Sequence, residues 1–290
     1  MRRPSSRLAV CAASVAALVG SALVAAQQPT ITNSLGMELV LVQPGTFTVG
    51  RFQPAYAKPP DPNAPPDAAP AGRRGGRGGP PPTADEYKRI EEAWRKDASN
   101  GFQVTIDRPY YIGKYEVTQA QYQKVMGTNP SLFKGALVTD AAGDHPVDSV
   151  TWADAQAFVR KLNQLEKSTA YRLPTEFEWE WAARAGADDD IAWADRRPQA
   201  FNSGQTTQAV GKMQPNKAGL YDMLGNVWEW VADSYNEKLF ADPKPSASGK
   251  QHVLKGGSFV ADVANLSYTT HAAGPANTFD VGFRIVREVK

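Results

Sequence analysis

The sequence predicts one mixed domain of strands and helices in which a large share of the chain is irregular. Alternating apolar residues within 37–50 are typical of short strands, and capping signals between residues 118 and 186 are typical of helices. From Ile191 onward, glycine, asparagine and proline recur among scattered aromatics, which favours loops and very short strands. No internal repeat is detectable, and 31–52 together with 100–290 have the size of a single domain.

The expected strands lie on both sides of a long insertion. Residues 37–42 and 45–50 predict a strand, a turn and a second strand, because apolar residues recur with strand periodicity. Residues 102–106 and 110–112 have the same character. We expect them to continue the sheet after the insertion.

Three helices are expected next, and each has a recognisable start. The capping residues are Thr118 with Gln121, Thr151, and Thr175 with Glu178. Gly186 suits the end of the third helix, because glycine accepts the left-handed conformation of a helix C-terminus. Phe177 and Trp181 are four residues apart and are expected to pack together against the core, with Trp179 on another face.

Residues 1–26 have the features of an export signal. Three arginines precede an uncharged stretch from residue 8 to residue 26, and small residues stand before Gln27, as a signal peptidase requires. The stretch is also close to the ~20 residues that span a bilayer, so an uncleaved anchor is the alternative. We expect cleavage after Ala26, an exported (periplasmic or secreted) protein and a mature domain over 27–290.

Cys11 is the only cysteine of the chain, and it lies within the predicted signal. The mature protein would therefore have no disulfide, no thiol nucleophile and no cysteine-ligated metal. Cleavage would also remove three arginines from 32 basic residues and none of 30 acidic residues, which leaves a net charge near −1. This balance gives no support to nucleic-acid binding, and we expect no membrane span after cleavage.

A Pro/Gly-rich insertion interrupts the domain at residues 53–82. Ten prolines and five glycines fall within it, together with three arginines between glycines. So little apolar surface cannot offset the entropy of ordering the backbone, so we predict a disordered or polyproline-like tract. The arginine–glycine part is expected to be a solvated linker, with contact to RNA or an acidic polymer as the alternative. Residues 84–98 then predict a charged helix.

The most informative segment runs from residue 219 to residue 233. Two tryptophans bracket Glu229, and a turn-forming Asp-x-x-Gly-Asn begins at Asp222. Hard cations such as Ca²⁺ require several oxygen ligands from carboxylates and carbonyls, which this turn offers. The alternative is a tight turn that enters a tryptophan-rich core strand, with the acids solvated.

Ordered sequence matches give the chain a close resemblance to the formylglycine-generating-enzyme family, also called sulfatase-modifying factors. The matches are residues 36–40 (Gly-Met-Glu-Leu-Val), 45–47, 111–118, 145–147 (His-Pro-Val), 150–152, 172–180 (Arg-Leu-Pro-Thr-Glu-Phe-Glu-Trp-Glu), 219–230, 255–258 (Lys-Gly-Gly-Ser) and 282–284 (Gly-Phe-Arg). They follow the family's order over nearly the whole mature chain apart from 53–99. The resemblance implies a C-type-lectin-like α+β fold that is poor in regular structure and stabilised by calcium.

The same resemblance implies a ligand set for that calcium. The side chain of Asp222, the carbonyls of Gly225 and Val227, and the carboxylate of Glu229 occupy the family's ligand positions. A second family calcium would use Asn202 and the carbonyl of Ser203 together with a downstream acidic loop. Residues 204–209 contain no acid, so we expect this second site to be missing or incomplete.

The resemblance fails at the family's reaction centre. Formylglycine-generating enzymes carry two cysteines that bind Cu(I) and oxidise a substrate cysteine with O₂, and the matching positions here are Ala261 and Leu266. Soft Cu(I) requires thiolate ligands, and exchange with a substrate thiol requires a thiol. We therefore expect no copper and no copper-dependent oxidase activity.

A groove beside Ser258 is the place where a function is expected. Its expected lining, by position in the family, is Trp228, Ser258, Phe259, Asp262, Asn265, Tyr268 and His271. A Ser258–His271–Asp262 hydrolase is a weak alternative, because Gly-Gly-Ser lacks the Gly-x-Ser-x-Gly pattern of a nucleophile elbow. The family's usual arginines are replaced by residues 266–271, which indicates a changed ligand.

An iron site is a second weak alternative. His145, His252 and His271 are the only histidines and lie far apart in the sequence, and His145 belongs to a motif that looks structural. A facial triad of His252, His271 and an acid is formally possible, but we expect no iron. Two hypotheses remain: a calcium-stabilised binding or accessory module for an unidentified protein, peptide or small molecule, and a superfamily enzyme that acts through non-cysteine residues, with or without a metal.

Overall fold

The computed structural model describes residues 28–50, 101–187, 193–240, 249, 251–261, 263–274 and 279–289. The predicted signal at 1–26, the tract at 53–82, the expected helix at 84–98 and Asp262 lie outside the described residues. Within the described part of the chain, no helix is long and apolar enough to cross a membrane.

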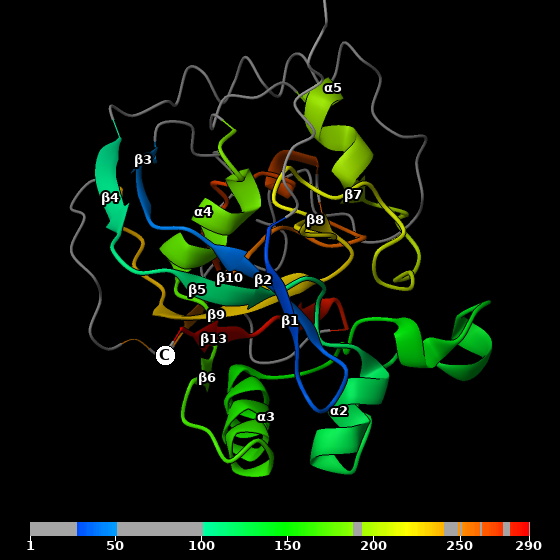
Figure 1. Ribbon diagram of the computed structural model, residues 1–290. Helices are drawn as coiled ribbons and strands as arrows, with labels where there is room; N and C mark the ends of the chain where they lie inside the picture. Colours follow the sequence, from blue (N-terminus) through cyan, green and yellow to red (C-terminus); the bar gives the residue numbers. More distant parts are fainter. Residues whose placement is uncertain are drawn as a thin grey trace, which may run out of the picture.

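In the part of the chain that the structure describes, the elements are four β-sheets and four α-helices (Figure 1). The largest sheet has the order β1 (Thr30–Thr32), β2 (Glu38–Val42), β5 (Tyr110–Gly113), β13 (Val286–Glu288) and β6 (Tyr171–Arg172). The second has the order β11 (Ala272–Ala273), β10 (His252–Lys255), β9 (Trp228–Ser234) and β12 (Val281–Phe283). Two two-stranded sheets pair β3 (Gly45–Val49) with β4 (Phe102–Ile106), and β7 (Ala200–Phe201) with β8 (Leu224–Gly225).

The α-helices are α2 (Gln119–Met126), α3 (Trp152–Leu165), α4 (Glu176–Arg184) and α5 (Trp193–Arg196). Single 3₁₀ turns occur at η1 (Gly135–Leu137), η2 (Ala142–Asp144), η3 (Arg197–Gln199) and η4 (Val263–Asn265). Seven of the strands lie beyond residue 191, and they are two to seven residues long. The prediction of loops and very short strands in this half is confirmed.

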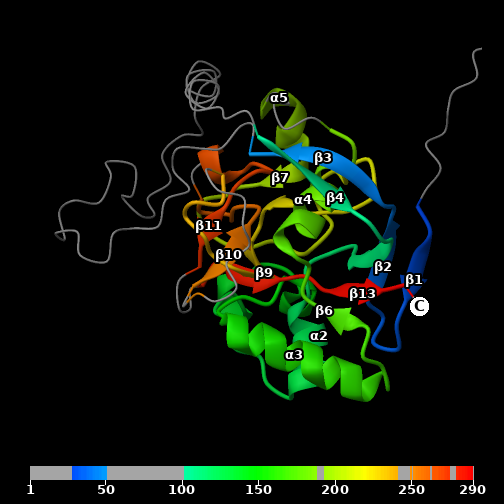
Figure 2. The ribbon, with the colours of Figure 1, turned by 90° about the vertical axis from the view of Figure 1, so that its left-hand side faces the viewer.

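The two larger sheets separate two hydrophobic cores. Successive residues of one strand enter opposite cores, as Trp230 and Val231 do on β9, and Leu39 and Val40 do on β2. Helices α2 and α3 cover one core, whereas α4 and the β3–β4 hairpin cover the other (Figures 1 and 2). Strands of these sheets are therefore buried on both faces.

All three predicted helix starts are confirmed. At Thr118, Thr151 and Thr175, the hydroxyl accepts a backbone N–H from the third helical residue, whose side chain accepts the threonine N–H in return. The last helix ends at Arg184, and Ala185 takes the left-handed cap position with φ 47°, one residue before the expected Gly186. The reciprocal caps satisfy N–H groups that a short helix otherwise leaves without partners.

Phe177 and Trp181 are partly buried and pack against the core, as expected, and Trp179 is the fully buried tryptophan of α4. Their ring contacts are with Phe102 and Phe47 of the β3–β4 hairpin, and here the structure corrects a prediction. The hairpin is also a separate sheet, and β2 pairs with β1 and β5 instead of β3. The alternation of apolar residues within 37–50 predicts the strands, but it does not predict which strands pair with each other.

A glycine beside Trp230 gives a test of this packing. A Cβ atom at Gly274 would lie 1.9 Å from the indole Cζ3, and Trp230 is held by its Nε1–H bond to the carbonyl of Val150. We expect Gly274→Ala to lower the free energy of unfolding by on the order of 3 kcal/mol, measured by urea denaturation, because the core must move to admit the methyl group.

Gly143→Ala is the matched control, because its Cβ would meet only Ala120 at an ordinary 3.4 Å. We expect it to change stability by less than about 0.5 kcal/mol. Equal stability of the two variants would contradict the packing described here.

Candidate functional site

The turn that enters β9 has a strained, irregular backbone. Asp222, Gly225 and Asn226 all have positive φ angles, of 55°, 87° and 56°. Asn226 is fully buried and tethers the turn, because its N–H donates to the carbonyl of Phe201 and its carbonyl accepts the N–H of Phe259. A Cβ at Gly225 would lie 2.0 Å from the Phe201 carbonyl oxygen, so only glycine fits there.

Three buried carboxylates gather around this turn. Glu116, Asp222 and Glu229 are each only 1% exposed. Glu116 accepts the side-chain N–H of Asn226 at 2.7 Å and the backbone N–H of Val227 at 3.2 Å. One carboxylate oxygen of Asp222 accepts the N–H of Gly211 at 2.6 Å, and the other is buried with no hydrogen-bond partner.

A single guanidinium faces these carboxylates. Arg284 is fully buried and binds both carboxylate oxygens of Glu229, each at 2.7 Å. Its remaining N–H groups donate to the carbonyls of Gly113 and Tyr221. Trp179 adds an indole N–H to Glu229 at 2.8 Å. Glu229 is therefore well paired, whereas Glu116 and Asp222 have no cation of their own among these groups.

The unbalanced charge is visible in the pKa values of the two acids. Burial, reinforced by the negative charges of Asp222 and Glu229, raises the pKa of Glu116 well above its usual range. Burial is also the main cause that raises the pKa of Asp222 to about 6. Three carboxylates against one guanidinium favour either protonation or a bound cation.

Among the described residues, no three His, Cys, Asp or Glu side chains are arranged to hold a metal ion. The expected calcium set does not need three, because two of its four ligands are backbone carbonyls. The partnerless oxygen of Asp222 is the observation that fits a hard cation at this turn.

The residues expected for the second calcium are used differently. The side-chain amide of Asn202 donates to the carbonyls of Ser258 and Ala261, at 3.0 and 2.9 Å. The hydroxyl of Ser203 accepts the N–H groups of Gln205 and Thr206 and donates to the carbonyl of Thr206. Asn202 thus connects the loop at residues 202–206 to the corner of the chain at Ser258–Ala261. We call this segment the Ser258 corner.

The side chains expected to line an open groove at this corner are largely buried. Ser258, Phe259, Tyr268 and His271 are at most 1% exposed, whereas Trp228 and Asn265 are half-buried. Of the expected lining that the structure describes, Trp228 and Asn265 therefore reach the surface most, and the groove lining stays a prediction.

The hydrolase alternative has no geometric basis in the described residues. The hydroxyl of Ser258 donates to the carboxylate of Asp280 at 2.8 Å, and no hydrogen bond joins it to His271. The imidazole of His271 is instead bonded to Glu176 at 2.7 Å through Nδ1 and to the carbonyl of Asn236 at 3.0 Å through Nε2.

His271 belongs to a buried chain of charges that sequence reasoning missed. Glu176 lies 3.6 Å from the ammonium of Lys255, which also binds Glu180 at 3.0 Å, and Glu180 binds Arg184. Burial acts to raise the pKa of Glu176, but the positive charges of His271 and Lys255 outweigh it and lower this pKa. Through its two ring nitrogens, His271 therefore links Glu176 to the backbone carbonyl of Asn236.

His252 is engaged elsewhere, which leaves the iron triad without an assembled ligand set. Its ring stacks on Trp152 with a centroid separation of 3.6 Å, and its Nδ1 lies 3.3 Å from the carbonyl of Asp233. His145 bonds to Asp140 and Thr207 through its two ring nitrogens. In the part of the chain described here, the three histidines thus serve three different structural contacts.

An exposed apolar surface lies over the Ser258 corner instead of a polar groove. Phe133 and Phe259 pack edge to face at 5.0 Å, and the ring of Phe279 lies 6.2 Å from both. Phe279 is 44% exposed, and Leu132 and Leu137 on the neighbouring loop are 47% and 55% exposed. We call these three exposed side chains the Phe279 patch.

A buried carboxylate fixes the loop that presents this patch. Asp148 accepts the N–H groups of Leu132 and Phe133, and the hydroxyl of Ser131 accepts the N–H of Asp148. The hydroxyl of Thr206 reaches the carbonyl of Leu137 at 3.5 Å, so the loop also meets the segment that Asn202 fastens to the Ser258 corner. The loop that carries Leu132 and Leu137 is therefore held by hydrogen bonds to its surroundings, and Phe279 meets it through its ring contact with Phe133.

Comparison with known proteins identifies the family. The sequence profile of the "Sulfatase-modifying factor enzyme 1-like domain" family matches residues 25–289. The chain belongs to this family. The "Chaperone protein LppX" of Paenibacillus barcinonensis is 31% identical over 240 residues, which cover 61% of this chain and 80% of that protein.

A formylglycine-generating enzyme of Streptomyces coelicolor is 33% identical over 174 residues, or 50% of this chain and 53% of the enzyme. The chain thus matches only about half the length of that relative. Among solved structures, Treponema denticola variable protein 1 aligns with a TM-score of 0.68 and 25% identity over 90% of this chain and 99% of that one. The C-type-lectin-like α+β fold expected from the sequence is confirmed.

Leu266 and Ala261 are the two positions that the resemblance matches to the family's copper cysteines. Leu266 is fully buried and belongs to the core cluster that also contains Trp179 and Tyr268. Ala261 is half-buried, and its carbonyl accepts a hydrogen bond from Asn202. The side chains at these two positions are therefore a packed leucine and a methyl group.

The raised pKa of Asp222 predicts an unusual pH dependence in protein treated with EDTA. The folded state holds a proton on Asp222 up to about pH 6, whereas an unfolded aspartate releases it near pH 4. The folded state therefore binds more protons in this window, and stability falls as pH rises from about 4 to 6. We expect a loss on the order of 2–3 kcal/mol, measured by urea denaturation.

Asp222→Asn is expected to remove most of this dependence of stability on pH. The dependence that remains is assigned to Glu116. The exposed Asp195 gives a matched control, because Asp195→Asn should leave the slope unchanged. A slope that persists at full size in Asp222→Asn would show that Asp222 is ionised in the folded state and would contradict the prediction.

Proposed function

We propose that this protein is an exported, calcium-stabilised binding or accessory module of the sulfatase-modifying-factor family that does not use copper oxidase chemistry. The observation that carries the proposal is the Phe279 patch, which stands over the Ser258 corner where the family's enzymes hold their cysteines. A fixed and exposed apolar surface is suited to binding a partner, not to activating O₂.

The loss of oxidase chemistry is supported by the atoms at the two copper positions. Cu(I) requires soft ligands, and Ala261 and Leu266 offer only hydrocarbon. The single cysteine of the chain, Cys11, is far from both in sequence. Leu266 is also packed into the core, so no neighbouring side chain can take its place without repacking.

Calcium is supported by charge and by ligand type. The carboxylates of Glu116, Asp222 and Glu229 outnumber the guanidinium of Arg284, so a divalent cation would balance the buried charge. The partnerless oxygen of Asp222 is a hard ligand, and Glu229 retains acceptor capacity because its Oε1 receives only one N–H. We propose one calcium held by Asp222, Glu229 and the carbonyls of Gly225 and Val227.

We propose no second calcium at Asn202 and Ser203. Asn202 turns its amide nitrogen towards two carbonyls, and Ser203 closes a local turn with Thr206. Neither residue has a nearby acid from residues 204–209 to complete a site. Internal hydrogen bonds have taken the place of a metal in fastening this loop.

A role in binding also agrees with the relatives. LppX, which shares 31% identity, is named a chaperone protein. We propose that the Phe279 patch engages an apolar segment of a partner protein in a comparable accessory role. The alternative of an iron-dependent enzyme gains no support from the described residues, because His252 and His271 are each committed to other contacts.

Metal analysis of the dialysed protein tests the calcium site. We expect about one equivalent of calcium by elemental analysis, and a fall of the melting temperature on the order of 5 °C when EDTA removes it, because ligand binding stabilises only the folded state. Added calcium should restore the melting temperature. Stoichiometric iron or copper that survives dialysis would contradict the proposed metal content.

Substitution of the Phe279 patch tests the binding role. We expect the protein to slow the aggregation of heat-unfolded citrate synthase, followed by light scattering, and the double variant Leu137→Ser, Phe279→Ser to lose most of this effect. Leu165→Ser is the matched control, since Leu165 is 55% exposed like Leu137 but lies at the end of α3.

Equal protection by the double variant and the wild type would remove the Phe279 patch from the proposal. The copper argument has a separate test, which is conversion of a cysteine in a sulfatase-motif peptide to formylglycine. Turnover above background would overturn the proposed loss of oxidase chemistry, whatever the outcome of the binding experiment.

A further inference from the structure

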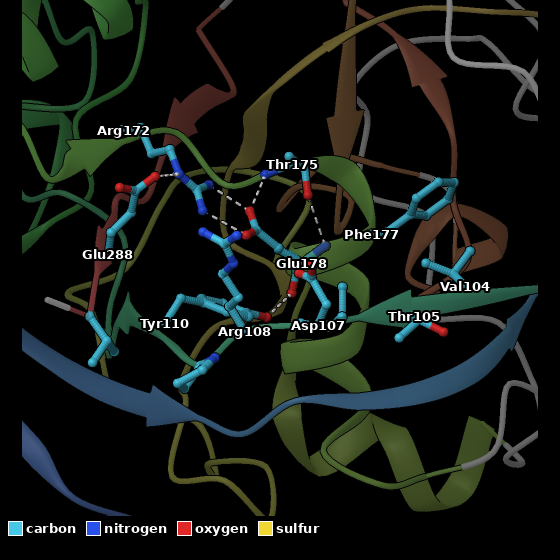
Figure 3. Close-up of a pocket in the computed structure, with 13 residues that line it drawn as sticks. Val104, Thr105, Asp107, Arg108, Tyr110, Arg172, Thr175, Phe177, Glu178 and Glu288 are labelled. Carbon is cyan, nitrogen blue, oxygen red and sulfur yellow. Dashed lines mark hydrogen bonds and ion pairs between the residues drawn. The ribbon is translucent and has the colours of Figure 1, made fainter.

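A second candidate site lies at the start of α4 and shares no residue with the turn at Asp222–Glu229, which we call the charged turn. It is a pocket of about 440 Å³, within the range of ligand-binding pockets, and it is drawn in Figure 3. Strand β4 and the link to β5 form one wall, the start of α4 forms another, and β6 and the end of β13 form the floor. None of its lining residues belongs to the Ser258 corner or the Phe279 patch.

The pocket lies along an unpaired edge of β4. It is lined by Val104, Thr105 and Ile106, which are consecutive, and by no residue of β3. Consecutive strand residues point to opposite faces, so a pocket that touches all three must lie at the edge of the strand and not on one face. Among the described residues, β4 pairs only with β3 and makes no further backbone hydrogen bond.

Among the described residues, nothing gives this edge the usual protection against strand addition. Exposed edges are normally blunted by lysine, proline, a bulge or a covering element. The five residues of β4 are uncharged and contain no proline, and their register with β3 is unbroken. Every second residue of such a strand presents an N–H and a carbonyl to the side away from its partner.

The polar side chains on the floor of the pocket are held by hydrogen bonds to one another. Arg172 binds both carboxylate oxygens of Glu178, each at 2.6 Å, and reaches Glu288 at 3.1 Å, as Figure 3 shows. The hydroxyl of Tyr110 donates to the carbonyl of Glu178 at 2.6 Å. Phe177 supplies a partly buried aromatic wall near Val104.

The rim of the pocket carries unpaired charges of both signs. Asp107 and Arg108 are exposed and form no ion pair or hydrogen bond with another described residue, and Glu288 contacts Arg172 through only one of its carboxylate oxygens. A simple anion would satisfy Arg108 alone, and a simple cation would satisfy the acids alone. A peptide backbone supplies donors and acceptors together and matches both the rim and the strand edge.

We propose that this pocket binds an extended peptide segment, which adds to the free edge of β4 as a further strand and places one apolar or aromatic side chain against Phe177. Main-chain hydrogen bonds to β4 provide affinity, and the wall at Phe177 selects the side chain, as in other cases of β-strand addition. The site is independent of the function proposed for the Phe279 patch.

Fluorescence anisotropy with defined probes tests the proposal. The probe is fluorescein-labelled Thr-Val-Phe-Val-Thr amide, and its partner probe has both valine nitrogens methylated. We expect saturable binding of the first probe to the full chain and about thirtyfold weaker binding of the second, because methylation removes two N–H donors worth about 1 kcal/mol each. Replacing the central phenylalanine by glutamate should also weaken binding.

Protein variants locate the site. We expect Phe177→Ala to weaken binding about tenfold and Arg108→Ala to weaken it by a smaller factor, whereas Arg160→Ala, which lies outside the pocket, leaves it unchanged. Arg108 is exposed, so its variant is a safe choice if Phe177→Ala fails to fold.

Three outcomes would overturn the proposal. The first is no saturable binding up to millimolar probe. The second is equal binding of the methylated probe, which would show recognition of the side chain without strand addition. The third is binding that Phe279→Ser abolishes and the pocket variants do not, which would place the peptide at the Phe279 patch instead.

Discussion

The pairing of Glu229 with Arg284 holds this domain together. It lies in the interior where β9, the end of β12, the end of β5 and the turn at Tyr221 meet, and Trp179 extends it to α4. Removing one partner would leave an uncompensated charge in the core, a change that typically destabilises by about 3–5 kcal/mol. The described helices and strands are mostly short. This contact therefore joins segments that, in a more helical fold, would be joined by packing between helices.

Local signals in the sequence predicted the parts of the fold that depend on local physics. Threonine caps fix where helices start within a few residues of chain, so all three starts were predictable. The Asp-x-x-Gly-Asn turn was equally predictable, because positive φ angles select glycine and asparagine. The family resemblance added the fold, which local patterns do not specify.

The parts that escaped prediction depend on contacts between distant residues. Glu116 joins the charged turn from 110 positions away, and nothing near it in sequence marks it as a partner of Asn226. The chain from His271 through Glu176 to Lys255 joins three separate segments in the same way. The burial of Tyr268 and His271 could not be foreseen for a related reason, because a position in the sequence does not say which distant residues cover a side chain.

The two strands of the β3–β4 hairpin are joined by an unusually long connection, because β3 ends at Val49 and β4 begins at Phe102. Loop closure becomes about 0.6 kcal/mol less favourable with each doubling of loop length, so this hairpin gains little from proximity in the unfolded chain. Its two strands are instead joined through α4, because Trp181 contacts Phe47 on one strand and Phe177 contacts Phe102 on the other. The aromatic side of α4 thus acts as the link between two strands that the sequence keeps far apart.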